Sequence, residues 1–258
     1  MLLPYRYFIK LSYKGTNFHG WQLQANAHSV QAELNRALSL ILKQKIVTMG
    51  AGRTDTGVHA AEMYAHFDCD RDVIPGKKDF LYHLNCNLDW DISVQDIYKV
   101  RNNANARFDA YARTYKYQIT RVKNPFLKDY AWFVYGELDI EKMNKGANWL
   151  LGKKDFKSFT KGNTQVTNNI CDVQFAEWKQ EGELLIFTIR ANRFLRNMVR
   201  AIVGTLVDVG RNKITFADLE RIVEGKNRSE AGFSVPAQGL FLVKVEYKEV
   251  VLTVNDSE

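Results

Sequence analysis

The sequence predicts an α+β fold made of two lobes of similar order. Strand-like alternation of apolar residues recurs in both halves of the chain, and stretches with helical spacing lie between these runs. The length of 258 residues and the hydrophobic content of 46% are enough for two packed lobes with a sizeable core. We therefore expect a first lobe at residues 1–105 and a second at residues 106–258, sharing sheet edges.

The first lobe begins with a predicted strand, because apolar and aromatic residues alternate from Tyr5 to Tyr13 before a break at residues 14–17. Ser29 is the predicted N-cap of a helix whose apolar residues recur at helical spacing up to Leu42. The pattern after this helix predicts a strand at 46–49, a loop, a strand at 63–67, a helix at 79–85 and a strand at 96–100.

The second lobe is predicted to repeat this mixture of strands and helices. Gly204 lies inside one of its helices, where glycine costs about 1 kcal/mol relative to alanine, so we expect close backbone packing there. The predicted elements are a strand at 111–119, a helix at 138–151, a strand at 184–189, a helix at 194–209 ended by Gly210, a helix at 218–224 and a strand at 240–247.

Basic residues are concentrated in two parts of a chain whose net charge is +7. Residues 101–129 contain seven Lys and Arg against two acidic residues, and residues 190–228 contain nine against four. This concentration is typical of a groove that follows a phosphate backbone, so we expect a polyanionic partner.

Other features of the composition exclude several classes of protein. No apolar run approaches the ~20 residues of a membrane span, and the N-terminus has no basic start followed by an apolar core, so we expect a cytoplasmic protein that binds no membrane. Cys69, Cys86 and Cys171 are odd in number and far apart, which favours packing roles over a disulfide framework or a zinc cluster. No glycine-rich nucleotide cradle occurs, so we expect chemistry without a cofactor.

The histidines do not predict a metal site. His19, His59 and His66 are each isolated, and none lies at helical spacing from another ligand type. We expect His59 to orient or pack neighbouring groups rather than to act as a general base.

The run GRTDTGVH at residues 52–59 points most directly to chemistry. It places Asp55 near Arg53 in a loop between two predicted strands, and the flanking glycines let the backbone turn sharply and approach a ligand closely. Because Arg53 can hold the carboxylate ionised, Asp55 is a candidate catalytic residue. The alternative is an aspartate that hydrogen-bonds only its own turn.

Two further groups of residues are candidates for contacts with a nucleic acid. Arg193, Arg196 and Arg200 are spaced three and four residues apart, so on a helix they would form one stripe suited to a carboxylate or to phosphates. The alternative is a row of solvated arginines. On the strand at 111–119, Arg113 shares a face with tyrosines, which suits stacking of an unpaired base, the alternative being a half-buried sheet face.

Six ordered motifs resemble the tRNA pseudouridine synthase A family nearly from end to end. GRTDTGVHA at residues 52–60 is the most specific of them, because the family pattern is GRTDxGVHA. The others are YKGTNFHGWQLQ at 13–24, RFDAYARTYKY at 107–117, DFKSF at 155–159, NRFLRNMVRAIVG at 192–204 and GLFLVKVEY at 239–247.

The resemblance implies a fold and a set of site residues. The fold would be the pseudouridine synthase fold, in which two ferredoxin-like, RRM-like lobes share a mixed, mostly antiparallel sheet flanked by helices, with the active-site cleft between the lobes. Asp55 falls on the catalytic aspartate and Arg53 on the arginine beside it. Tyr115 falls on the tyrosine that stacks on the target base, and Arg200 on the basic residue expected to pair with the aspartate. The remaining arginines that we expect to bind the substrate are Arg107, Arg113, Arg193 and Arg196.

The activity implied by the resemblance is the conversion of uridine to pseudouridine at positions 38, 39 and 40 of the tRNA anticodon stem-loop. It needs no metal or cofactor, and the family's homodimer lets tRNA reach across both subunits. Two routes for Asp55 stay open, namely nucleophilic attack and abstraction of the sugar 2′ proton. Two alternatives to the function also stay open: a catalytically silent protein that binds structured RNA, and a pseudouridine synthase with another RNA target.

Overall fold

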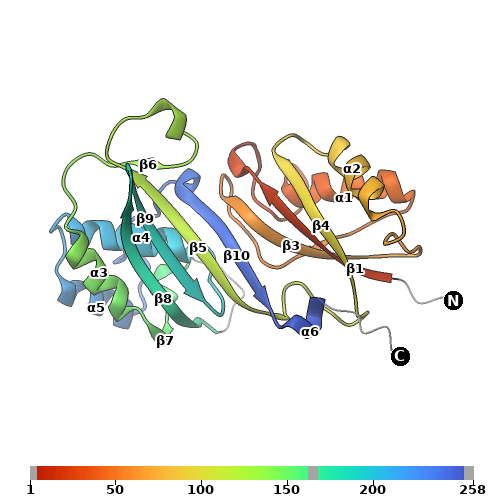
Figure 1. Ribbon diagram of the computed structural model, residues 1–258. Helices are drawn as coiled ribbons and strands as arrows, with labels where there is room; N and C mark the ends of the chain where they lie inside the picture. The colour runs from red at the N-terminus through yellow and green to blue at the C-terminus, as the bar shows by residue number, and fades with distance from the viewer. Residues whose placement is uncertain (1–4, 162–167, 253–258) are drawn as a thin grey trace. The chain divides into compact units, whose positions relative to one another are not determined.

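The computed structural model describes residues 5–161 and 168–252. These residues form a mixed α+β fold in which a large, mostly antiparallel sheet is flanked by helices, and this confirms the predicted fold class (Figure 1). The chain divides into two compact units. The first unit contains Met1–Tyr111 and Leu242–Glu258, and the second contains Ala112–Phe241. The division into lobes at residues 1–105 and 106–258 stays a prediction.

The sheet of the first unit has the order β4-β1-β3-β10, and the pairs β1–β3 and β1–β4 are antiparallel. Helices α1 and α2 cover one face of these strands (Figure 1), α2 packs on β4, and Ile9 and Leu11 of β1 are fully buried. The elements are β1 (Tyr5–Tyr13), a 3-10 turn (Gly15–Asn17), α1 (Val30–Leu42), β2 (Met49–Gly50), β3 (His59–Cys69), α2 (Lys77–Cys86), β4 (Ile92–Val100), the larger part of β10 (Leu240–Tyr247) and α6 (Glu249–Leu252).

Helix α1 begins as the sequence predicts. The Ser29 side chain accepts a hydrogen bond from the amide of Ala32, which is the bond expected of an N-cap. The strand predicted at residues 46–49 is confirmed only at Met49, because β2 is Met49–Gly50. Side chains of α1 hold the backbone of this segment instead: Asn35 Oδ1 accepts from the Thr48 amide at 2.9 Å, and Gln31 Nε2 donates to the Thr48 carbonyl at 2.6 Å.

The sheet of the second unit has the order β5-β9-β8-β7, all antiparallel, and β6 adds a short parallel pair to β5. Helix α3 packs on β8 and on α4, and α5 packs beside both helices (Figure 1). The elements are β5 (Ala110–Thr120, which enters from the first unit), β6 (Trp132–Phe133), α3 (Ile140–Trp149), β7 (Gly152–Asp155), β8 (Ile170–Glu181), β9 (Leu184–Ala191), α4 (Met198–Gly210), α5 (Phe216–Gly225) and 3-10 turns at Pro125–Leu127, Lys157–Phe159 and Ala237–Gly239. None of the helices in the described ranges is long and apolar enough to cross a membrane.

The start of α4 corrects one prediction. The sequence pattern predicted a helix from residue 194 that would carry three arginines as one stripe, but the helix begins at Met198. Asn197 adopts a left-handed backbone conformation with φ +67°, which interrupts the helical path just before Met198. Only Arg200 therefore lies on the helix, and Arg193 and Arg196 lie in the connection that precedes it.

The cysteines have different surroundings. Cys69 and Cys171 are buried, which confirms their predicted packing roles, whereas Cys86 is exposed at the end of α2, so the prediction is wrong for this residue.

Candidate active site

The loop that carries Asp55 joins β2 to β3, as the sequence predicts. The Val58 amide donates to the Asp55 carbonyl at 3.2 Å and closes a tight turn. Gly57 lies in the left-handed region with φ +79°, so glycine is needed at this position of the turn. Asp55 is half-buried and Thr56 is exposed.

Residues 15–21, which we call the bracing segment, hold this loop from one side. The Trp21 amide donates to the Thr54 carbonyl at 3.2 Å, and the Gly57 amide donates to the Phe18 carbonyl at 3.3 Å. The segment lies within the motif at residues 13–24, for which the sequence predicted no function. Gly15 and Gly20 are the local signal for its close approach to the loop, since a Cβ at either position would meet the backbone of Val58 or Thr54.

His59 closes the loop on its far side. The imidazole is buried, and its Nδ1 accepts a hydrogen bond from the Gly15 amide at 3.0 Å. An accepting Nδ1 requires that this nitrogen carry no proton. His59 thus has the orienting and packing place that the sequence predicts.

Arg53 does not pair with Asp55. Its side chain is exposed, and among residues 5–161 and 168–252 it takes part in no ion pair or hydrogen bond. Of the two arginines that the sequence offered as partners for the carboxylate, the structure therefore disfavours Arg53. Its exposed guanidinium is available to a ligand.

Tyr115 lies in the middle of β5 with its ring half-buried, opposite Ile189 of β9. Phe194 supports the ring in an edge-to-face arrangement, with centroids 5.0 Å apart and planes at 83°. Tyr117, two residues along the same face, is fully buried, and its hydroxyl donates to the Pro236 carbonyl at 2.8 Å. Burial raises the pKa of Tyr117 far above its ordinary value, and the charge of Arg200 opposes this shift. Tyr117 is a core residue, and Tyr115 is the tyrosine of this pair that can meet a ligand.

Arg200 is held by the segment at residues 231–236. Its Nε donates to the Val235 carbonyl at 2.7 Å, and the Val235 amide donates to the Arg200 carbonyl at 3.3 Å. Ser234 anchors the same segment to the start of α4, since its hydroxyl accepts from Asn197 Nδ2 at 2.6 Å. The Arg200 side chain is half-buried.

Sequence reasoning missed Arg228, which it counted only as part of a basic segment. Its guanidinium donates to the carbonyls of Ala231 and Gly232 and to the Ser234 hydroxyl, at 2.9 to 3.2 Å. Burial lowers the pKa of Arg228 below its ordinary value. Arg228 thus pins the segment that holds Arg200, and no local sequence pattern indicates this.

The other predicted arginines lie in different settings. Arg113 donates from Nη1 to the Asn192 carbonyl at 3.0 Å. Arg193 is half-buried near Cys171, whose pKa burial raises to about 11 while the arginine charge opposes the shift. Arg196 is exposed. Arg107, the only one of these in the first unit, is exposed with its guanidinium 5.6 Å from the centroid of the Phe108 ring.

The predicted site residues are divided between the two units. Asp55, Arg53 and Arg107 belong to the first unit. The second unit contains Tyr115, Arg113, Arg193, Arg196 and Arg200.

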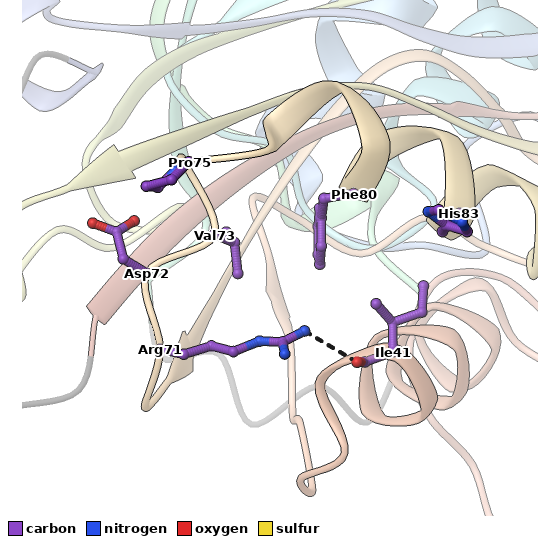
Figure 2. Close-up of a pocket in the computed structure, with 7 residues that line it drawn as sticks. All are labelled: Ile41, Arg71, Asp72, Val73, Pro75, Phe80 and His83. Atoms are coloured by element: carbon purple, nitrogen blue, oxygen red, sulfur yellow. Dashed lines mark hydrogen bonds between the residues drawn. The ribbon is translucent and has the colours of Figure 1, made fainter.

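A separate hollow of about 330 Å³ lies in the first unit and does not coincide with this site (Figure 2). Arg71 crosses one side of it and donates from Nη2 to the Ile41 carbonyl at 3.1 Å. Phe80, Val73 and Pro75 add apolar walls. None of the predicted site residues lines this hollow.

Comparison with known proteins assigns the family. A family model described as tRNA pseudouridine synthase matches residues 147–248. The tRNA pseudouridine synthase A of Bacteroides thetaiotaomicron is 52% identical over 96% of this chain and 93% of its own length. The proteins of the same name from Bacteroides fragilis and Parabacteroides distasonis are 50% and 48% identical, and the matches cover 95% and 97% of this chain and 98% and 99% of those proteins. The chain belongs to the tRNA pseudouridine synthase family.

Proposed function

We propose that this protein converts uridine to pseudouridine at positions 38, 39 and 40 of the tRNA anticodon stem-loop. As a member of its family the chain is an isomerase that acts on uridine in tRNA, since relatives named tRNA pseudouridine synthase A match nearly its whole length. The observation that carries the proposal is the braced Asp55 loop within such a chain. The choice of positions 38, 39 and 40 in the anticodon arm is the part that we propose.

The reaction needs one ionised carboxylate beside the sugar. The bond between N1 of uracil and C1′ of the ribose breaks, the base rotates, and C5 forms the new bond to C1′. The proton that C5 loses is balanced by the proton that N1 gains, so product and substrate are isomers. We assign the carboxylate to Asp55, as the nucleophile or as the base that removes the 2′ proton. Its half-buried position lets it meet a ligand while the loop holds its backbone.

Tyr115 is proposed to hold the base while it rotates. A ring supported edge-on by Phe194 presents a face of fixed direction on which uracil can stack. The Tyr115 hydroxyl is the candidate to receive the C5 proton late in the reaction. The buried Tyr117 is excluded from this role because its hydroxyl is engaged with Pro236.

The arginines are proposed to bind the RNA. A uridine within a stem has to be extruded, at a cost of a few kcal/mol that phosphate contacts and stacking offset. The exposed Arg53 fills the gap left by the extruded base, and Arg200 pairs with the catalytic carboxylate. Phosphate contacts are assigned to Arg107, Arg113, Arg193 and Arg196. We also propose that the protein acts in the cytoplasm as a homodimer, on the basis of its family resemblance.

Pseudouridine mapping tests the proposal. An unmodified tRNA transcript is incubated with the purified protein, or with Asp55→Asn, without added metal or nucleotide. We expect product at positions 38 to 40 with the wild type alone, while both proteins bind the tRNA with similar affinity that falls steeply with salt. Product at other positions would reassign the RNA target. Tight binding without product would favour the silent RNA-binding protein.

A further inference from the structure

We propose that Tyr13 is a positioning residue for Asp55, acting through the side chain of Thr54. The proposal rests on the proposed function, in which Asp55 is the catalytic carboxylate. Tyr13 is the last residue of β1 and is distant in sequence from the loop, so no local pattern connects the two.

The contact between Tyr13 and Thr54 is a buried hydrogen bond. The Tyr13 hydroxyl lies 2.9 Å from Thr54 Oγ1, and the two residues are 4% and 7% exposed. The Tyr13 ring packs against the Trp21 ring of the bracing segment, with centroids 6.2 Å apart. A hydroxyl pair that is shielded from water keeps a defined geometry, because no solvent partner competes for it.

Thr54 is held at two points, and this fixes the residue that follows it. Tyr13 holds the side chain, and the Trp21 amide holds the carbonyl. Because the peptide unit is planar, the direction of the Thr54 carbonyl sets the direction of the Asp55 amide and the position of the Asp55 Cα atom. The position of the Asp55 carboxylate then depends only on the torsion angles of Asp55 itself.

The bracing segment adds steric limits at both ends of the loop. A Cβ on Gly20, whose φ is +82°, would lie 2.4 Å from the Thr54 carbonyl oxygen. A Cβ on Gly15 would lie 2.0 Å from the Val58 carbonyl oxygen. The two backbones are therefore in direct contact on either side of Asp55, and the loop has no room to move toward the segment.

Loss of the Tyr13 hydroxyl is expected to slow the chemical step without weakening RNA binding. A displacement of about 1 Å at a reacting group can reduce the rate by roughly 100-fold. Tyr13 is buried in the loop scaffold and is not exposed to RNA. Tyr13→Phe should therefore lower kcat by roughly 10- to 100-fold and leave KM for tRNA within about twofold of the wild-type value.

The test compares this variant with a matched control on the same strand. Tyr7→Phe also removes a buried tyrosine hydroxyl from β1, one that donates to Asp72 at 2.7 Å and lies outside the proposed site. Thr54→Val removes the other half of the contact, and Thr54→Ser keeps a hydroxyl that can restore it. The steady-state kcat and KM and the unfolding midpoint are measured for all variants. The wild type and Asp55→Asn are included in the same assay.

The outcomes separate this proposal from the proposed function. A fall in kcat for Tyr13→Phe and Thr54→Val, with near-normal turnover for Thr54→Ser and Tyr7→Phe, supports the positioning role. Wild-type kcat in Tyr13→Phe overturns it, as does a loss no larger than that of Tyr7→Phe. If the wild type makes no pseudouridine, or if Asp55→Asn remains active, the proposed function fails and this proposal fails with it.

Discussion

The carbonyl oxygen of Phe233 occupies the space in which a side chain on Gly204 would begin. An ideal Cβ at residue 204 would lie 2.1 Å from that oxygen. This contact confirms the close backbone packing predicted for a glycine in the middle of a helix. It also lets residues 231–236 lie against α4, where the Val235 carbonyl receives the Arg200 guanidinium. A glycine with no chemistry of its own thus contributes to the position of a proposed active-site arginine.

Gly204→Ala is expected to destabilise the protein. Alanine favours a helix by about 1 kcal/mol over glycine, but the added methyl group would force the Phe233 carbonyl away, and overpacking of this kind costs about 1–3 kcal/mol or more. Urea unfolding of the variant should show a lower midpoint. Gly225→Ala, at the exposed end of α5, is the control, because its Cβ would meet only the flexible end of the Glu230 side chain at 3.4 Å. Equal midpoints for Gly204→Ala and the wild type would contradict the packing argument.

Tyr115→Phe is expected to retain tRNA binding and lose turnover. The phenyl ring keeps the edge-to-face contact with Phe194 and the stacking face, but it has no hydroxyl for the late proton transfer. Proton transfer by a positioned group contributes roughly 100-fold or more, so single-turnover rates should fall by about that factor. Tyr111→Phe, on the same face of β5 and 45% exposed, is the matched control. A wild-type rate in Tyr115→Phe would show that the hydroxyl is dispensable.

Arg200→Ala and Arg200→Lys should both lower activity. Lysine keeps the charge but lacks the Nε hydrogen that reaches the Val235 carbonyl, so it cannot hold the same direction. We expect at least a roughly tenfold loss of kcat in both variants, measured under single-turnover conditions. Arg71→Ala provides the comparison, because Arg71 also donates to a backbone carbonyl but lies in the hollow away from the proposed site. If the two alanine variants behave alike, Arg200 has only a structural role.

The stability of the protein is expected to fall in mild acid because of His66. This imidazole is 6% exposed, and its Nδ1 accepts from the Ala106 amide at 3.1 Å. Burial, assisted by the charge of Arg6, lowers the pKa of His66 below its ordinary value. The neutral form is therefore favoured in the folded state. The contribution of His66 to the free energy of unfolding is complete above the pKa of histidine in the unfolded chain, about 6.5. It is lost as the pH falls through the lower pKa of His66 in the folded protein.

A substitution at His66 isolates this contribution. His66→Gln can still offer an acceptor to Ala106 but does not titrate, so its free energy of unfolding should change less between about pH 7.5 and about pH 5 than that of the wild type. Urea unfolding at the two pH values provides the measurement. His83→Gln, at an exposed position of α2, should keep the wild-type difference. An unchanged pH dependence in His66→Gln would assign the acid sensitivity to other groups.

The sequence by itself determined the elements whose pattern is local. The strand at Tyr5–Tyr13, the helix from Val30 and the strand at Leu240–Tyr247 are all confirmed, because alternation and helical spacing are set by the burial of neighbouring residues. The same holds for the Asp55 loop between β2 and β3, and for the need for glycine at position 57.

The tertiary structure decided the features that depend on partners distant in the sequence. Strand β8 escaped prediction because a bulge between Val173 and Phe175 shifts the buried positions from odd to even residues. The start of α4 depends on Asn197, whose side chain bonds to Ser234 far along the chain. The backbone of Thr48 is bound by side chains of α1. In each case a long-range hydrogen bond or register shift overrides the local pattern.

The candidate site divides in the same way. Asp55 could be named from its own loop motif, and Tyr115 could be named through the resemblance of its motif to the family. Their neighbours could not be named, because the contact of Tyr13 with Thr54 and the contact of Phe194 with Tyr115 are created only by folding. The sequence specifies which residue stands at each position, whereas the direction of its side chain is set by the residues that pack around it.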